Sequence, residues 1–518
     1  MAIRRYLTSP GTWAVLVGIA TTIACIAWEV RTGFNLGDEG YLWYGIQRIA
    51  FGEVPIRDYQ AYDPGRYYFT AGLLRLTGAH GILAVRYVIA ALQAMALCFA
   101  LAWLARVHDR RGMLSYLVLC AVTLAVWMFP RHKLYDISIC IGLVCMLAWW
   151  IGRPSGVRSF MVGSFVGLAA YFGRNHGIYG LMASAGVFVY LALDRPFRAH
   201  WLQNAGAYIL GVIVGYIPMF ATMLLVPQFT ASLVDSVKLI FQVTGTNLPL
   251  PLPWPWKVPF EGATFLDSAR AILVGLIFLF LPVFFCLSSA FVFVRRWQGK
   301  PVHPLIVASA FCAVPYTHYA YSRADVSHLA QGIFPALIGV LAMSAAAKGW
   351  IRYGLLFLIC ALSLFVAMPQ HPGWQCREPG SCTRLVIGDD ELSVDAGVVS
   401  NVTLLRRLKA DLAPDDRNLF VAPLMPGAYA VLGARSPTLE SYTAWKRSEP
   451  FQLEELDRVK AANPGFLLIM DVPLDGRDDL RYENTHPLLN RYIKDNYREL
   501  SGYTDNPAYH IYQGRPLR

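Results

Sequence analysis

The stretch NLGDEGYLWYGIQRIAFGEVPIRDYQAYDPGRYYF, residues 35–69, directly follows an apolar segment, residues 12–30, that is long enough to cross a bilayer. Carboxylates are costly beside a lipid surface, and they are retained there mostly where they serve a function. The stretch therefore indicates a functional outer loop, and a solvated, acidic interfacial loop is the alternative. Its five acidic residues are Asp38, Glu39, Glu53, Asp58 and Asp63.

The composition of the whole chain is that of a membrane protein. The 518 residues are 56% hydrophobic and only 15% charged, whereas soluble proteins carry about 25% charged residues. The first apolar segment lacks the small-residue cleavage site of a signal peptide, and the chain continues from it into the acidic stretch. We therefore expect this segment to be the first transmembrane helix of a polytopic, α-helical membrane protein.

About eleven apolar spans predict transmembrane helices, near residues 12–30, 81–105, 113–129, 136–151, 160–172, 177–193, 205–226, 269–294, 303–319, 329–347 and 353–369. When the sides alternate, every loop on one side is basic, and the positive-inside rule makes that side the cytoplasm. An odd number of spans then places the N-terminus inside and the C-terminus outside. The basic loop residues are Arg4, Arg5, Arg106, Arg110, Arg111, Arg153, Arg158, Arg195, Arg198, Arg295, Arg296, Lys300, Lys348 and Arg352.

The acidic residues of the membrane half gather on the other side. Of those before residue 370, only Asp109 and Asp194 fall in cytoplasmic loops. Acids have little influence on orientation, so this asymmetry suggests that the outer face performs chemistry. The net charge of +11 comes from the cytoplasmic loops, since residues 370–518 carry slightly more acids than bases. We therefore expect no nucleic-acid partner.

The chain changes character after residue 369. We expect residues 1–369 to form a transmembrane domain whose first outer loop spans 31–70, and residues 370–518 to form an extracytoplasmic α/β domain. Its predicted elements are strands in RNLFVAP (417–423), GFLLIMDV (465–472) and AYHIYQG (508–514), and an amphipathic helix in EPFQLEELDRVKAA (449–462) that Asn463-Pro464 ends.

Two of the ten cysteines lie outside the apolar segments. Cys376 and Cys382, in CREPGSC, predict a short disulfide that suits an oxidising compartment, and two free thiols are the alternative. The other eight act as small hydrophobic residues, and none shows metal-site spacing.

The order of motifs in the outer loop resembles that of the GT-C glycosyltransferases, in the branch of the protein O-mannosyltransferases and the lipid A aminoarabinose transferase. The matching motifs are DEG (38–40), G-x-x-P-x-R-D (52–58) and DPG-x-YY (63–68). They follow a first helix and stand beside a similar helix count and an external tail. The resemblance implies transfer of a single sugar from a polyprenyl-phosphate donor to an acceptor on the outer face, in enzyme class EC 2.4, with inversion of the anomeric centre.

The resemblance also assigns roles to residues. Asp38 matches the position of the family's catalytic acid and is our predicted general base, because an attacking hydroxyl must give up its proton to a carboxylate within hydrogen-bond distance. Glu39 is the alternative base. Asp58 and Tyr62 of the same loop are predicted to bind substrate, and Asp136 to be the second outer acid.

Further outer-face clusters could neutralise the leaving phosphate. PRHKLYD, FGRNHG and THYAYSRADVSHL supply the predicted donor-phosphate or substrate residues Arg131, His132, Lys133, Asp136, Arg174, His176, Arg323, Asp325 and His328. The alternatives are lipid-headgroup contacts for the first cluster, a satisfied polar turn for the second and a structural Arg323–Asp325 pair for the third. We expect no cofactor and no metal, and a divalent ion at His318, Asp325 and His328 is the alternative.

Other functions remain open. A transporter or flippase of a lipid-linked sugar, a non-catalytic partner with the same fold, and a ligase that moves a whole glycan from polyprenyl diphosphate are the rivals. The absence of an internal repeat and the gathering of charge at one face favour the enzyme over the transporter. The expected partners are the donor, membrane lipids and an acceptor protein, glycolipid or glycan, and the expected location is the bacterial inner membrane with the C-terminal domain in the periplasm.

Overall fold

The computed structural model describes residues 9–108, 111–245, 248–414 and 418–514, so Arg4, Arg5, Asp109 and Arg110 lie outside the described residues. Contacts divide the chain into two compact units, which we call the helical unit and the mixed unit. The helical unit comprises Met1–Val30, Arg86–Leu225 and Asn247–Trp374, and the mixed unit comprises Arg31–Val85, Val226–Thr246 and Gln375–Arg518. The boundary at residue 369 stays a prediction.

The chain is mostly helical, and each of the eleven predicted apolar spans falls on a helix or a helix pair. Five helical segments of the described chain are long and apolar enough to cross a membrane, or seven if two bent pairs each count as one span. The five are α2 (Pro10–Glu29), α5 (Gly81–Val107), η1 (Arg131–Lys133) with α7 (Leu134–Gly152), α14 (Phe265–Trp297), and α18 (Trp350–Ala367) with η3 (Met368–Gln370).

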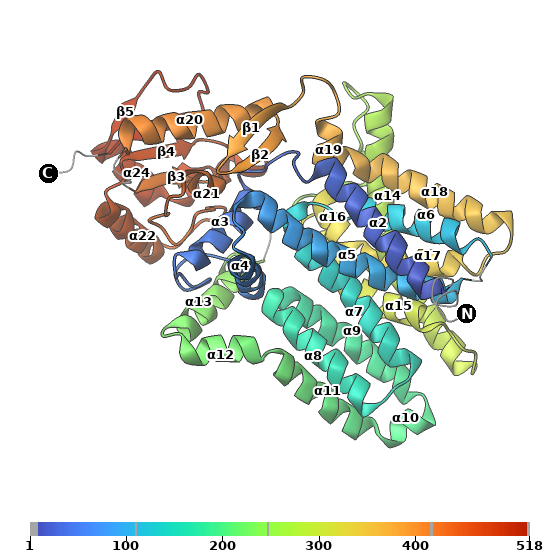
Figure 1. Ribbon diagram of the computed structural model, residues 1–518. Helices are drawn as coiled ribbons and strands as arrows, with labels where there is room; N and C mark the ends of the chain where they lie inside the picture. Colours follow the sequence, from blue (N-terminus) through green and yellow to red (C-terminus); the bar gives the residue numbers. More distant parts are fainter. Residues whose placement is uncertain (1–8, 109–110, 246–247, 415–417, 515–518) are drawn as a thin grey trace. The chain divides into compact units, whose positions relative to one another are not determined.

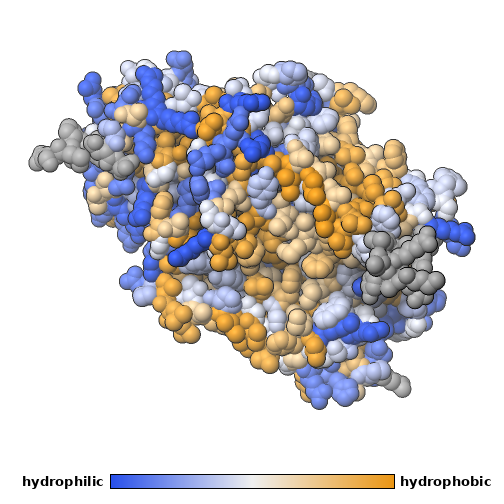
Figure 2. Space-filling model, viewed as in Figure 1, coloured by the Kyte–Doolittle hydropathy of each residue, from blue (hydrophilic) through white to orange (hydrophobic). Residues whose placement is uncertain are grey.

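The remaining predicted spans are bent, short or more polar. The bent pairs are α11 (Trp201–Gly215) with α12 (Ile217–Leu225), at 46°, and α16 (Val326–Gly332) with α17 (Phe334–Ser344), at 58°. The others are α6 (Met113–Val126), α8 (Gly156–Phe172), α9 (Arg174–Ala192) and α15 (Pro304–Ser322). The chain is thus a multi-pass membrane protein, and hydrophobic side chains cover α11 and α12 in Figure 2.

Helices α8 and α11 lie side by side because glycines let their backbones approach (Figure 1). A Cβ added at Gly163 or Gly167 of α8 would collide with a carbonyl of α11, and one at Gly211 or Gly215 of α11 would collide with a carbonyl of α8. Both helices therefore carry the G-x-x-x-G spacing that brings transmembrane helices together where lipid supplies no hydrophobic drive.

The mixed unit contains a four-stranded sheet of order β3-β4-β6-β5. β3 and β4 are parallel, with Val421 opposite Leu468, and the other neighbours are antiparallel. Successive strand residues face opposite sides of the sheet, so Phe420 and Leu467 enter a core with α22 and α24. The strands are β3 (Leu419–Ala422), β4 (Phe466–Met470), β5 (Arg498–Leu500) and β6 (Tyr509–Gln513).

Helices cover the sheet. α22 (Glu449–Ala462) and α24 (Pro487–Asn496) pack on one face, and α20 (Ala396–Leu412) contacts β4. The predicted strands and the predicted helix 449–462 are confirmed, whereas α20, α24 and β5 were not predicted. The unit also contains α3 (Asp38–Ala50), α4 (Gly65–Thr77), α13 (Phe229–Gln242), α19 (Pro372–Gln375) in part, β1 (Thr383–Ile387), β2 (Asp390–Val394), α21 (Gly427–Leu432) and α23 (Tyr482–Thr485).

Candidate active site

Asp38 and Glu39 form the first turn of α3. The Asp38 backbone N–H donates to Asn35 Oδ1 at 2.8 Å, which starts the helix. Carboxylates are favourable here because the amino end of a helix carries partial positive charge. Asp38 is half-buried, and its carboxylate makes no hydrogen bond or ion pair within the described part of the chain, whereas Glu39 is only 8% exposed. Asp38 is therefore the more open acceptor of the two.

The start of α3 is held by a segment almost four hundred residues further along the chain. Gly40 packs against Gly427, and a Cβ at Gly40 would lie 2.5 Å from the Gly427 Cα. The Gly427 N–H donates to the Leu36 carbonyl at 2.8 Å. Two small residues are needed where two backbones approach this closely. The predicted first outer loop and the C-terminal segment thus form one folded body.

Aromatic residues extend this contact along α3. The Tyr44 ring stacks on Tyr429 at 5.1 Å between centroids, and the Ser436 N–H donates to the Tyr44 hydroxyl at 2.6 Å. The Gln60 N–H donates to the Leu439 carbonyl at 2.8 Å. Sequence reasoning missed these positioning residues, because nothing in the local pattern around residues 424–442 indicates which distant segment they contact.

Three tyrosines gather close to the start of α3. Tyr41 meets Tyr62 edge-on at 5.4 Å and Tyr442 at 6.0 Å between centroids. A Cβ added at Gly37, the residue before Asp38, would lie 3.7 Å from the Tyr442 ring. The predicted residue Tyr62 is thus placed in an aromatic group beside Asp38, and Tyr442 is a member that the sequence did not reveal.

Two other acids of the loop are engaged in ion pairs. Asp58 accepts two hydrogen bonds from Arg57, each 2.8 Å, and one from the Val54 N–H at 2.7 Å. Burial would raise the pKa of Asp58, but the bonds from Arg57 and Val54 outweigh it and lower the pKa below its ordinary value. Glu53 pairs with Arg48. These carboxylates stabilise the loop, and Asp58 is not open in the way that Asp38 is.

The helical unit holds a buried polar cluster. His176 Nε2 lies 2.8 Å from Asp136 Oδ1, and His176 Nδ1 lies 2.8 Å from the Tyr316 hydroxyl. The exposed fractions are 1% for His176 and 4% for Asp136. Nearby, the Tyr179 hydroxyl lies 3.1 Å from His318 Nδ1. Two residues that sequence reasoning placed in separate clusters, Asp136 and His176, are therefore partners.

The predicted cluster near α16 is also internally paired. Arg323 Nε donates to Asp325 Oδ2 at 2.8 Å, and Asp325 Oδ1 caps α16 by accepting the His328 N–H at 2.8 Å. His328 Nδ1 lies 2.9 Å from the same oxygen. Burial would raise the pKa of Asp325, but these bonds to His328 and Arg323 outweigh it and lower the pKa. The alternative of a structural Arg323–Asp325 pair thus describes the observed contact.

The other predicted cations belong to the helical unit. Arg131, His132 and Lys133 form η1 at the start of α7, and His132 is buried there. Arg174 begins α9. Asp38 and Glu39, by contrast, belong to the mixed unit. Within the described residues, no three His, Cys, Asp or Glu side chains are grouped so as to hold a metal ion. Cys376 and Cys382 form a disulfide with a Cα–Cα distance of 5.3 Å.

Comparisons with known proteins give a fold. No family model and no curated protein matches this sequence. Among solved structures, ArnT from Cupriavidus metallidurans, crystallised with undecaprenyl phosphate, is similar with a TM-score of 0.54 and 13% identity, over 97% of this chain and 98% of that one. An Archaeoglobus fulgidus oligosaccharyltransferase gives a TM-score of 0.48 with 12% identity, over 97% of this chain and 74% of that one. The chain therefore has the fold of the GT-C glycosyltransferases.

Proposed function

We propose that this protein is a glycosyltransferase that moves one sugar from a polyprenyl phosphate to an acceptor at the outer face of the membrane. The observation that carries the proposal is the open Asp38 carboxylate at the start of α3. The neighbouring acids Glu53 and Asp58 are engaged by arginines. Asp38 therefore has the free acceptor capacity that a general base requires.

The reaction is a single displacement. Asp38 accepts the proton of an acceptor hydroxyl, the hydroxyl oxygen bonds to the anomeric carbon, and the bond from that carbon to the phosphate oxygen breaks. Polyprenyl phosphate leaves with the electron pair, and the anomeric centre inverts. Glu39 is the second candidate for the base, although its burial makes it less accessible to an acceptor.

The leaving phosphate needs positive charge, and hydrogen bonds to charged groups are worth about 1.5–3 kcal/mol each. We assign this role to Arg131 and Lys133, which begin a candidate membrane span, with Arg174 as a further donor. The fold shared with a protein crystallised with undecaprenyl phosphate supports a polyprenyl phosphate as the donor. We propose that the protein lies in a bacterial inner membrane with the mixed unit in the periplasm, and that the acceptor is a protein, glycolipid or glycan.

Donor consumption by the reconstituted enzyme tests the proposal. Proteoliposomes receive undecaprenyl-phosphate hexose, pentofuranose or aminopentose, with a mixture of periplasmic acceptors, and mass spectrometry measures the released undecaprenyl phosphate. The wild type and Asp235→Asn, a change on the exposed face of α13, should consume one donor, and Asp38→Asn should not. If the wild type consumes no donor, or if Asp38→Asn consumes it at the wild-type rate, the proposal is wrong.

A further inference from the structure

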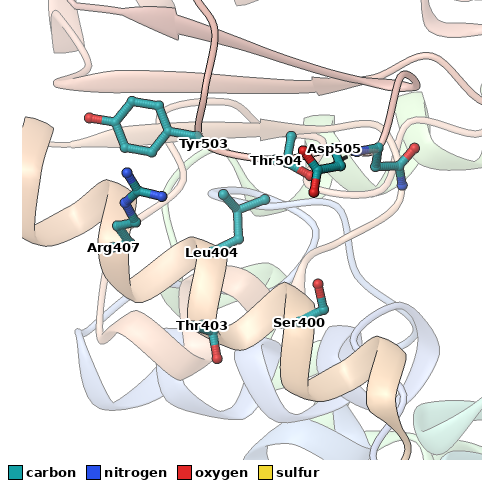
Figure 3. Close-up of a pocket in the computed structure, with 8 residues that line it drawn as sticks. Ser400, Thr403, Leu404, Arg407, Tyr503, Thr504 and Asp505 are labelled. Carbon is teal, nitrogen blue, oxygen red and sulfur yellow. Dashed lines mark hydrogen bonds between the residues drawn. The ribbon is translucent and has the colours of Figure 1, made fainter.

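The mixed unit has a half-open pocket of about 410 Å³ between α20 and the segment that links β5 to β6 (Figure 3). This volume falls in the range of about 300–1,000 Å³ that is typical of small-molecule sites. The pocket is separate from Asp38 in its lining and has no place in the transfer proposed above. Its lining residues are Ser400, Thr403, Leu404, Arg407, Tyr503, Thr504, Asp505 and Asn506.

One face of α20 forms the floor of this pocket. Ser400, Thr403, Leu404 and Arg407 stand at helical positions i, i+3, i+4 and i+7, so they share a face. Figure 3 shows Leu404 and Ser400 pointing toward the 503–506 segment and the Thr403 hydroxyl pointing away from it. The floor therefore combines the exposed Ser400 hydroxyl with the edge of Leu404, which is only 8% exposed.

The two charged side chains that line the pocket, Arg407 and Asp505, have opposite signs, and Asp411 lies beside Arg407 outside the lining. The Arg407 guanidinium lies 4.7 Å from the centre of the Tyr503 ring, donates to the Gly502 carbonyl at 3.5 Å and lies 3.7 Å from the Asp411 carboxylate. Asp505 adds a second carboxylate on the opposite wall. A phosphate or carboxylate ligand would have to lie beside Asp505 and compete with Asp411 for Arg407. These charges therefore disfavour an anionic ligand.

The opposite wall is a loop in which some polar groups are hydrogen-bonded and others are not. Thr504 Oγ1 accepts the Asn506 N–H at 3.1 Å, and Asn506 Oδ1 accepts the Ala508 N–H at 3.0 Å. Within the described residues, the Asn506 amide NH₂, the Ser400 hydroxyl and the Asp505 carboxylate make no hydrogen bond. Donors and acceptors therefore line the pocket together with the Tyr503 ring and the edge of Leu404.

We propose that this pocket binds a neutral carbohydrate. A sugar has hydroxyls that both donate and accept, and it has apolar C–H faces that pack on aromatic rings and aliphatic side chains. The pocket combines these requirements in a small volume, and its two charged lining residues, Arg407 and Asp505, have opposite signs. The site goes beyond the proposed transfer, because it would hold a glycan whether or not Asp38 performs chemistry.

Binding to the full chain tests this site directly. The protein is reconstituted in lipid nanodiscs without glycoside detergent, and saturation-transfer NMR measures binding of maltotriose, mannotriose, chitotriose and xylotriose. Inorganic phosphate and glucuronate serve as charged probes. Ser400→Trp fills the pocket, Asn506→Ala removes the free amide, and Glu454→Trp adds the same bulk at an exposed position of α22 as a matched control.

At least one trisaccharide should bind the wild type and Glu454→Trp with equal affinity. Its affinity should be at least about tenfold lower for Ser400→Trp, which loses the packing space, and for Asn506→Ala, which loses a hydrogen bond. The charged probes should not compete. The inference is wrong if no trisaccharide binds the wild type, if both pocket variants bind like the control, or if phosphate or glucuronate binds more tightly than the sugars.

Discussion

Two carboxylates, Asp38 of the mixed unit and Asp136 of the helical unit, both come from short motifs that the sequence predicts to lie at the outer face, and they differ in their surroundings. Asp136 is buried and lies 2.8 Å from His176, which in turn lies 2.8 Å from Tyr316. Asp38 is half-buried at the start of α3, and its carboxylate has no partner within the described residues. A hydrogen bond to a carboxylate stabilises its charged form, so an engaged carboxylate accepts a proton less readily than an open one. An open and accessible acid is therefore the better candidate for the base.

The comparison predicts its largest effect at Asp38. General base catalysis contributes about 10²–10⁴-fold to rate, so Asp38→Asn should lower sugar transfer by that factor while the protein stays folded. Glu39→Gln should have a smaller effect. The measurement is the transfer rate at saturating donor, together with the thermal unfolding of each variant. Equal losses in the two variants would show that the first turn of α3 acts as a whole and that Asp38 is not the base.

Glu455 is a third carboxylate, and it can be compared with Asp38 inside the mixed unit. Glu455 accepts the backbone N–H groups of Leu439, at 3.0 Å, and Glu440, at 3.3 Å, and so holds the segment that contacts Gln60. Burial raises the pKa of Glu455 from 4.5 to about 7. Unlike Asp38, this carboxylate is engaged and only 2% exposed.

Because the pKa of Glu455 is raised in the folded state, its contribution to the free energy of unfolding is complete below about pH 4.5. This contribution is lost as the pH rises toward 7. The loss amounts to at most about 3 kcal/mol at 1.36 kcal/mol per pKa unit. The midpoint temperature of thermal unfolding should therefore fall between pH 5 and 8 by more in the wild type than in Glu455→Gln. Parallel pH profiles for the two proteins would exclude this role of Glu455.

Replacing Asp136, the buried carboxylate, should lower the stability of the protein rather than act on the transfer chemistry. Asp136→Ala leaves His176 without its carboxylate inside the helical unit, and an unsatisfied buried polar group costs about 1–3 kcal/mol. The free energy of unfolding in nanodiscs should fall by this amount. Asp38→Asn should change it by less than about 0.5 kcal/mol, as a change away from the core does. Similar destabilisation by both variants would remove the distinction between the two acids.

A smaller effect should follow from displacing Asp38 without changing it. Gly40→Ala places a Cβ against the Gly427 backbone, and overpacking of this kind costs about 1–3 kcal/mol. We expect transfer to fall because the first turn of α3 shifts. Gly72→Ala is the matched control, since a Cβ there meets nothing within 4 Å. Unchanged transfer in Gly40→Ala would mean that the contact with Gly427 does not position the base.

The sequence predicted the elements far better than the contacts between them. The amphipathic period and the Asn463-Pro464 stop placed α22 at its observed bounds, and apolar runs located β3, β4 and β6. Local patterns carry this information because each element buries one face. The polar helix α20 was missed, and its mixed exposed face carries the pocket.

The candidate site was predicted only as separate motifs. Asp38 was predicted from its motif. The contact of Gly40 with Gly427 joins residues almost four hundred positions apart, and a close approach of two glycines leaves no periodic signal. The pairing of Asp136 with His176 was missed for the same reason, since η1–α7 and α9 meet only in the folded chain.

The most direct test of the open carboxylate is the lipid that the protein carries. Wild type and Asp38→Asn are purified in mild detergent from the same cells, and the bound lipids are identified by mass spectrometry. We predict that a glycosylated polyprenyl phosphate accumulates on Asp38→Asn, because the donor binds and is not consumed, and the mass of its head group identifies the sugar. If neither protein holds a polyprenyl lipid, even when supplied with it, the account is contradicted.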